Sequence, residues 1–140
     1  MKYLFDTCLV SELVRKAPEP KVAKWVAECE EDAAFLSVLT IGEIQKGISR
    51  LNEKKKKAFL QNWLDSHLRE RFKGRILPIS EDIAQTWGLM QGEAESKGKS
   101  ISTMDGLIGA TALAHNLTVV TRNESDLRPT GAKVLNPWSL

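Results

Sequence analysis

Four acidic residues stand where short hydrophobic segments give way to polar turns or to the first turns of helices. They are Asp6, Glu43, Asp105 and Asp126. The carboxyl ends of parallel strands converge on one crevice in α/β proteins, so these side chains are expected to meet there. Carboxylates gathered without cations repel one another, and their pKa values rise. A hard divalent cation prefers oxygen ligands and relieves that repulsion, so the sequence predicts a Mg²⁺ or Mn²⁺ site for phosphate chemistry.

The segments that must position these acids alternate between strands and helices. Strands are predicted over Tyr3–Phe5, Ala33–Leu36, Ile76–Ile79, Leu117–Thr121 and Ala132–Leu135. Helices are predicted over Leu9–Val14 with Thr7 as cap, Lys21–Glu30, Ser37 or Thr40 to Leu51, Glu53–Arg71, Ser80–Lys97 and Met104–His115. This alternation indicates βα crossovers and a mainly parallel sheet with helices on both faces.

The composition is typical of one globular domain, and we predict a single domain over residues 1–140. Hydrophobic residues make up 42% and charged residues 27% of the chain, which is ordinary for such a protein. The formal net charge of +2 is too small to mark a nucleic-acid binder, so any attraction for a polyanion must come from local patches.

The two cysteines and the hydropathy exclude several classes of protein. Cys8 and Cys29 form neither a disulfide framework nor a zinc-binding spacing. We therefore expect reduced thiols in a cytoplasmic protein. No segment approaches the roughly 18 continuous apolar residues that a membrane span requires, and Met1–Val10 lacks the pattern of a signal peptide.

Each acidic residue also has an ordinary structural explanation. Asp6 suits a turn or a helix cap, and Glu43 suits an exposed helical face. Asp105 would be favoured by the dipole of the helix that it opens, and Asp126 could stabilise an Asx-turn. Any one of these positions is therefore weak evidence for a site. Their joint placement at strand ends is the stronger signal.

Four stretches around these acids resemble the motifs of one known family. They are Tyr3–Leu13, Ser37–Ile48, Asp105–Ala112 and Val119–Leu127. In this order they resemble the first to fourth motifs of PIN-domain proteins, and the pattern is most similar to that of VapC-like toxins from bacterial toxin–antitoxin pairs. The ordered set covers nearly the whole chain and is far more specific than any one motif.

The resemblance implies a PIN-like α/β/α sandwich with a central, mainly parallel twisted sheet. It also implies Mg²⁺- or Mn²⁺-dependent endoribonuclease activity, a cognate antitoxin protein that blocks the site, and a homodimer. Asp6, Glu43 and Asp105 fall on the three acidic positions of the family, whereas the fourth position is either Asp126 or Asn123. Cys8 stands where many relatives have asparagine, which puts any polar contact from that position in doubt.

In the resulting hypothesis, cations bound by the acids activate water against an RNA phosphodiester. Asp6 and Asp105 are the first choices for direct metal ligands. Glu43 could ligate, bind through water or orient the nucleophile, and Asp126 completes the catalytic set. Hydrogen bonds around the acids or contacts to phosphate are expected from Thr7, Thr121, Asn123 and Arg122.

Other chemistries fit the sequence less well. His67 and His115 are not placed to form an acid–base pair, no P-loop is present, and Asp6 lacks the second aspartate of haloacid dehalogenase-type phosphatases. Two alternatives stay open. One is a catalytically silent PIN-fold binding module, and the other is a metal-dependent nuclease that acts on other nucleic acids.

Surface charges offer candidate contacts for RNA. They are Lys46, Arg50, Lys54–Lys57, Arg69, Arg71, Lys73, Arg75 and Arg122. A run such as Lys54–Lys57 is more often an ordinary solvated helix face. Apolar helical residues around Trp25, Leu51 and Phe59 are candidates for an antitoxin groove or a dimer interface.

Overall fold

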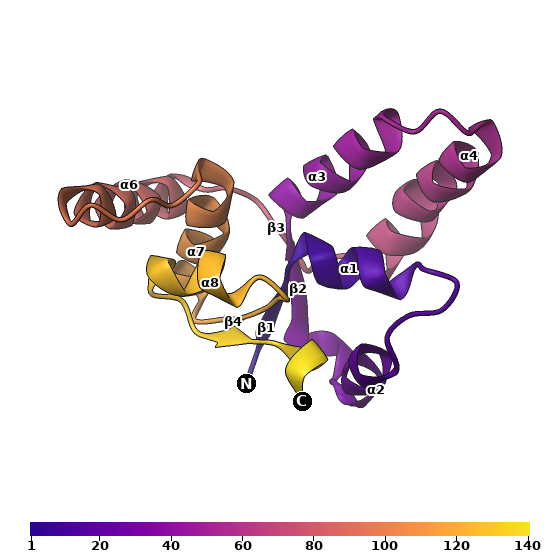
Figure 1. Cartoon of the computed structure of the whole chain (residues 1–140), viewed down its shortest axis with the longest axis horizontal. Helices are drawn as coiled ribbons and strands as arrows, with labels where there is room; N and C mark the ends of the chain where they lie inside the picture. Colours follow the sequence, from indigo (N-terminus) through magenta and orange to yellow (C-terminus); the bar gives the residue numbers. More distant parts are fainter.

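A five-stranded sheet runs through the centre of the computed structural model, which describes residues 1–140 (Figure 1). Its strands are β1 (Tyr3–Phe5), β2 (Ala34–Ser37), β3 (Ile76–Leu77), β4 (Thr118–Val120) and β5 (Val134–Leu135). Their order is β3-β2-β1-β4-β5, and all paired neighbours are parallel. The chain therefore builds outward from β1 in both directions, and the switch point of the topology lies between β1 and β4.

Helices connect the strands and cover both faces of the sheet. They are α1 (Thr7–Leu13), α2 (Pro20–Glu28), α3 (Val38–Ser49), α4 (Lys54–Asn62), α5 (Arg69–Arg71), α6 (Glu81–Ser96), α7 (Thr103–His115) and α8 (Glu124–Leu127). A π-helical segment, Trp63–Leu68, joins α4 to α5, and short 3₁₀ turns lie at Glu31–Ala33, Arg128–Thr130 and Pro137–Ser139. None of these helices combines the length and apolarity needed to cross a lipid bilayer.

Alternate side chains of the strands enter two separate cores. Phe5 and Leu36 belong to a cluster with residues of α1, α2 and α3, whereas Leu4 and Val119 belong to a second cluster with Ile108 of α7. This follows from the period of two along a strand, which sends neighbouring side chains to opposite faces. The predicted α/β/α sandwich with a parallel sheet is confirmed.

Helix starts agree with the sequence prediction except at α1. Ser37, Ser80 and Ser102 cap α3, α6 and α7 through their hydroxyl oxygens, as expected for serine at this position. The prediction that Thr7 caps the first helix is wrong, because Asp6 occupies the cap and Thr7 is the first helical residue.

The predicted helix over Glu53–Arg71 is interrupted by the π-helical segment. Its buried or partly buried leucines recur at every fourth residue, namely Leu60, Leu64 and Leu68. A π-helical turn closes i→i+5 hydrogen bonds and so changes the spacing of the buried face. Phe59 is 63% exposed and His67 is also exposed, so neither side chain belongs to the buried face formed by these leucines.

In the layer of the second core, α7 packs closely against the 3₁₀ turn Arg128–Thr130. A Cβ atom at Gly109 would lie 2.4 Å from both Cβ and Oγ1 of Thr130. Thr130 cannot move freely, because its hydroxyl donates to the Leu127 carbonyl at 2.6 Å and accepts from the Ala132 N–H at 3.2 Å. Only glycine at position 109 allows this close approach.

We expect Gly109→Ala to lower the free energy of unfolding by about 1–3 kcal/mol, because the added methyl group must displace Thr130. Gly92→Ala in α6 is the matched control. Nothing lies within 4 Å of a Cβ at Gly92, so alanine should stabilise its helix by about 0.5–1 kcal/mol. Urea unfolding of both variants measures the difference, and equal stability would contradict the close packing.

Candidate functional site

Asp6 is fixed at the junction of the two central strands. Its N–H donates to the Val120 carbonyl at 3.0 Å, which continues the pairing of β1 with β4 by one residue. The side chain is only 8% exposed. Oδ1 accepts from the Thr7 N–H at 2.9 Å, and Oδ2 accepts from the Thr121 hydroxyl at 2.7 Å. A buried carboxylate requires such donors, because desolvation without them is costly.

Thr121 ties Asp6 to the chain that leaves β4. Its side chain is fully buried, and Oγ1 accepts from the Asn123 N–H at 3.0 Å while donating to Asp6. The loop after β4 is thereby closed over the end of β1. This connection places Thr121 in the hydrogen-bonding role that the sequence suggested, with Asp6 as its partner.

Cys8 belongs to the same hydrogen-bonded group. Its Sγ lies 3.7 Å from Asp6 Oδ2 and 3.4 Å from Thr121 Oγ1, and it accepts from the Arg122 N–H at 3.4 Å. Burial, followed by the charge of Asp6, raises the pKa of the Cys8 thiol, so the thiol keeps its proton. The polar contact that the cysteine put in doubt is therefore made by sulfur.

Glu43 approaches from α3 and is linked to Asp6 through one residue. Glu43 Oε1 accepts from the Thr7 hydroxyl at 2.6 Å, and Thr40 Oγ1 lies 3.4 Å from the same hydroxyl. Thr7 thus gives its N–H to Asp6 and its hydroxyl to Glu43. No protein group donates to Glu43 Oε2, which leaves that oxygen free for a ligand.

Asp105 lies in the first turn of α7 and pairs with the residue that caps this helix. The Ser102 hydroxyl donates to Asp105 Oδ2 at 2.9 Å, and the Asp105 N–H donates to Ser102 Oγ at 3.1 Å. Burial raises the pKa of Asp105; the Ser102 hydrogen bond opposes this, and the negative charges of Asp126 and Asp6 add to the rise. The predicted repulsion between gathered carboxylates is therefore present at Asp105.

The fourth acidic position lies on α8. Asp126 is exposed, and its charge is the first carboxylate to act on Asp105. Asn123 is also exposed and precedes α8, but its side chain makes no capping hydrogen bond. Its backbone N–H serves Thr121 instead. Asp126 is thus the residue of this pair whose charge acts on Asp105.

The chemistry of the donor set suits a hard cation, although the side chains do not form a closed metal site. The side-chain atoms around Asp6 that could bind a metal are carboxylate or hydroxyl oxygens, apart from the Cys8 sulfur. Oxygen ligands are those that Mg²⁺ and Mn²⁺ favour. No group of three or more His, Cys, Asp or Glu side chains is arranged so that it could hold a metal ion. The structure brings Asp126 and Asp6 within electrostatic reach of Asp105, but the acids are not arranged as metal ligands.

The Arg122 side chain leaves the acidic group. Its guanidinium carbon lies 5.6 Å from the ring centroid of Trp138, which packs against the first core. Arg122 is also one of the charges that lower the pKa of Glu12, a shift caused first by the Glu19 N–H. Arg122 therefore contributes its backbone to the site and directs its charge toward Trp138 and Glu12.

A contact between α6 and α7, which sequence reasoning missed, supports the chain around Asp105. Gln91 donates through Nε2 to the Ile101 carbonyl at 3.0 Å, just before the cap Ser102. A Cβ at Gly106 would lie 2.7 Å from Gln91 Oε1 and 2.9 Å from Trp87 Nε1. The glycine beside Asp105 was the available signal, since glycine in a helix interior often marks a close approach.

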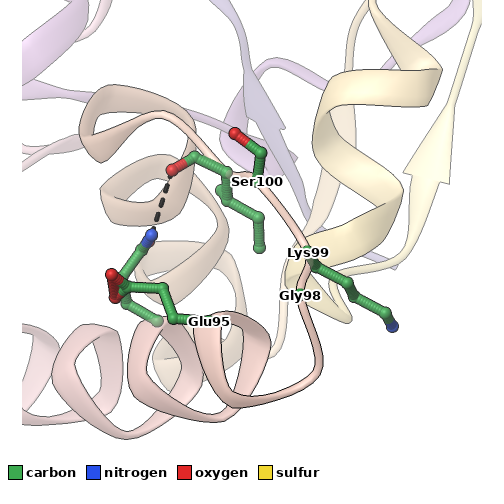
Figure 2. A pocket seen from close by; sticks show the side chains of 6 residues that line it. Glu95, Gly98, Lys99 and Ser100 are labelled. Carbon is green, nitrogen blue, oxygen red and sulfur yellow. Dashed lines mark hydrogen bonds between the residues drawn. The ribbon is translucent and has the colours of Figure 1, made fainter.

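Two hollows in the surface lie beside α6 and away from Asp6 and Glu43. One has a volume of about 340 Å³ and is lined by Gln91, Glu95, Gly98, Lys99, Ser100 and Ile101. In Figure 2 the Lys99 side chain points away from Glu95, so their charges do not converge on a ligand. The other hollow, about 170 Å³, lies between α6 and the turn at Thr130. Neither hollow is lined by Asp6, Glu43, Asp105 or Asp126.

Comparisons with known proteins point to one family. A model of the PIN domain family matches residues 3–131. The chain is 36% identical to toxin FitB of Neisseria gonorrhoeae over 135 residues, which are 96% of this chain and 97% of that protein. It is 31% identical to VapC ribonuclease Y4jK of Sinorhizobium fredii, with 96% of each chain covered. The crystal structure of FitAcB from Neisseria gonorrhoeae superposes with a TM-score of 0.93 at 36% identity, covering 99% of both chains.

Replacing Thr121 by valine should lower the free energy of unfolding by about 1–3 kcal/mol, because the buried Asp6 carboxylate and the Asn123 N–H both lose a partner. Thr111→Val is the control. Thr111 is equally buried, but its hydroxyl donates only to the Leu107 carbonyl of its own helix, so the loss should stay below about 1 kcal/mol. Chemical denaturation measures both variants.

Asp126→Asn should lower the pKa of Asp105 without restoring its ordinary value, because burial is the larger cause of the rise. Glu124→Gln, two residues away on α8, is the control and should leave the Asp105 pKa unchanged. NMR titration of the Asp105 carboxyl in metal-free protein measures both. An unchanged pKa in Asp126→Asn would show that Asp126 does not face Asp105.

Proposed function

Since the chain belongs to the PIN-domain family, we propose that it is the ribonuclease toxin of a toxin–antitoxin pair. It hydrolyses phosphodiester bonds of RNA with water activated by Mg²⁺ or Mn²⁺. The observation that carries this proposal is the electrostatic grouping of Asp105, Asp126 and Asp6 at one edge of the sheet. Glu43 joins the group through Thr7.

The relatives support both parts of the proposal. One is named a toxin and another a VapC ribonuclease, and the chain covers almost the full length of each. The family model spans residues 3–131, a range that contains all four acidic positions of this chain. An antitoxin that covers the acids, and a homodimer, belong to the same proposal.

Each acid has a role in the proposed reaction. When bound, a divalent cation supplies the positive charge that the site lacks and lowers the pKa of water. Asp6 and Asp105 would hold the cation, and Asp126 would complete the acidic set. The Thr7 and Thr121 contacts keep both Asp6 oxygens at the carboxyl edge, where the scissile phosphate must lie. Glu43 would orient the attacking water or contribute a ligand through its free oxygen.

One observation favours a second candidate, a catalytically silent binding module of the same fold. The acids are not arranged as a ready metal site. The raised pKa of Asp105 argues against a silent module, because an unused group of acids would lower stability without benefit. The raised pKa means that the folded state binds a proton more tightly than the unfolded chain does. The free energy of unfolding is therefore lowered as the pH rises above the ordinary aspartate pKa, where the unfolded chain has already lost this proton.

Asp6→Asn and Asp105→Asn should each reduce RNA cleavage by about 100-fold or more, because each removes a charged oxygen ligand. Asp82→Asn, an exposed first-turn residue of α6, is the control and should cleave RNA like the original chain. EDTA should abolish cleavage, and added Mg²⁺ or Mn²⁺ should restore it. Cleavage is followed on labelled RNA, and circular dichroism verifies that the variants are folded.

Full cleavage by a folded Asp6→Asn variant would sink the proposed assignment. Calorimetric titration with Mn²⁺ separates the two candidates, because the enzyme should bind the ion and the silent module should not. Loss of Mn²⁺ binding in Asp105→Asn would connect that ion to the acids at the sheet edge.

A further inference from the structure

The solvent face of α3 carries cations in line with Glu43. Lys46 and Arg50 follow Glu43 by three and seven residues, a spacing that places all three on one face of the helix. Both cations are exposed. The helix rises about 1.5 Å per residue, so Lys46 and Arg50 lie roughly 4.5 and 10 Å beyond Glu43 along its axis. A row of positive charge therefore starts at the acidic group and leads away from it.

This stretch concentrates the positive charge of the protein. Residues 44–57 contain six cations and one carboxylate, a net charge of +5 in a chain whose total is +2, which leaves −3 for the remainder. None of the ion pairs in the structure involves any of these six cations. Their positive potential is thus not neutralised by neighbouring carboxylates, and it is directed at solvent.

The lysines of α4 extend the row at an electrostatic cost. Lys54–Lys57 occupy the first turn of α4, which contains no acidic residue. Cations at a helix N-terminus oppose the helix dipole, and neighbouring lysines also repel one another. Lys57 Nζ donates to the Ser49 carbonyl at 3.3 Å, which brings the lysine run against the end of α3. An anionic partner would relieve this repulsion.

The two helices are locked together, so the row of charge is held in a fixed orientation. Gln45 of α3 and Gln61 of α4 exchange two amide hydrogen bonds of 2.8 Å each. Behind them, Ile44 and Ile48 of α3 pack in the first core with Leu64. In Figure 1, α3 and α4 project together beyond the sheet as one arm.

The solvent face of α3 is also open to close approach. Gly47 is exposed and lies between Lys46 and Arg50 in the sequence. Nothing lies within 4 Å of a Cβ built on Gly47, so packing does not require glycine there. Glycine inside a helix costs about 0.5–1 kcal/mol relative to alanine. Glycine at this position therefore adds no side chain to the exposed face between Lys46 and Arg50.

We propose that the face of α3 marked by Lys46, Gly47 and Arg50, continued by Lys54–Lys57, binds the phosphates of single-stranded RNA beside the cleavage site. This inference rests on the proposed function, because it names the surface along which the RNA substrate would reach the proposed cleavage site. RNA is the occupant that the charge favours: the face offers regularly placed, unpaired cations, and phosphates are anions repeated along a chain. The contacts read phosphate and not bases, so they supply affinity without sequence preference.

The test compares two double variants that remove the same charge. Lys46→Gln/Arg50→Gln alters the proposed face, and Lys21→Gln/Lys24→Gln alters exposed, unpaired lysines of α2, which lies away from the arm in Figure 1. Binding of a fluorescent single-stranded RNA is measured by anisotropy in EDTA, where the proposed cleavage cannot occur. The first variant should bind roughly tenfold more weakly, and its plot of log affinity against log salt should be shallower by about 1.4 for two lost phosphate contacts. The second should match the original chain.

The outcomes separate this inference from the proposed function. Equal RNA affinity in the two double variants, or no RNA binding by the original chain, would overturn the docking face and leave the cleavage experiment to stand alone. Equal affinity together with a change in oligomeric state of Lys46→Gln/Arg50→Gln would assign the face to a second copy of the chain. Weaker binding by that variant, in a protein that never cleaves RNA, would support the face and contradict the nuclease.

Discussion

The carboxylate of Asp6, buried where β1 meets β4, is the group on which the arrangement of the site depends. A charge in that position is tolerated only when donors surround it. The start of α1 supplies the Thr7 N–H, and the end of β4 supplies the Thr121 hydroxyl. Satisfying one buried charge therefore brings together segments that are more than a hundred residues apart. The same donors hold the carboxylate at the switch point of the sheet, which is the usual place for a site in this class of fold.

The other acids are held by different layers of the sandwich. Glu43 is tied through Thr7 to the layer that contains α1 and α3, whereas Asp105 is tied through Ser102 to α7 in the opposite layer. Each layer packs on its own core. The distances among the acids are therefore set by how the two layers rest on the sheet. Gly106 and Gly109 let α7 approach α6 and the turn at Thr130 closely. Burial is the first cause of the raised pKa of Asp105, and the charge of Asp126 on α8, in the same layer as α7, adds more to it than the charge of Asp6.

The net charge of the chain conceals a strong separation of charge. An acidic group lies at the carboxyl edge, and residues 44–57, which carry a net charge of +5, begin beside it. The proposed reaction joins a polyanion to a cation and needs both signs of charge, since the acids would hold the cation and the arm would attract the polyanion. Glu43, near the acidic group, and the cations Lys46 and Arg50 lie on the same helix, α3. This helix would therefore join the proposed binding of the cation to the proposed binding of the polyanion.

Much of this protein was determined by its sequence alone, because strand and helix periods and the order of the four motifs are local properties. The parallel sheet and the places of Asp6 after the first strand, Glu43 in the helix after the second strand and Asp105 in the first turn of a helix were predicted from them. Thr7 was misplaced as a cap because the partner of its hydroxyl, Glu43, is distant in the sequence. Only the tertiary structure decided that Asp126 acts on Asp105, that Cys8 replaces a polar side chain with a thiol contact, and that Gln91 supports the chain before Ser102. Those outcomes depend on distances between residues of different segments. The packing of the separate cores determines these distances, and the pattern of residues within one segment does not.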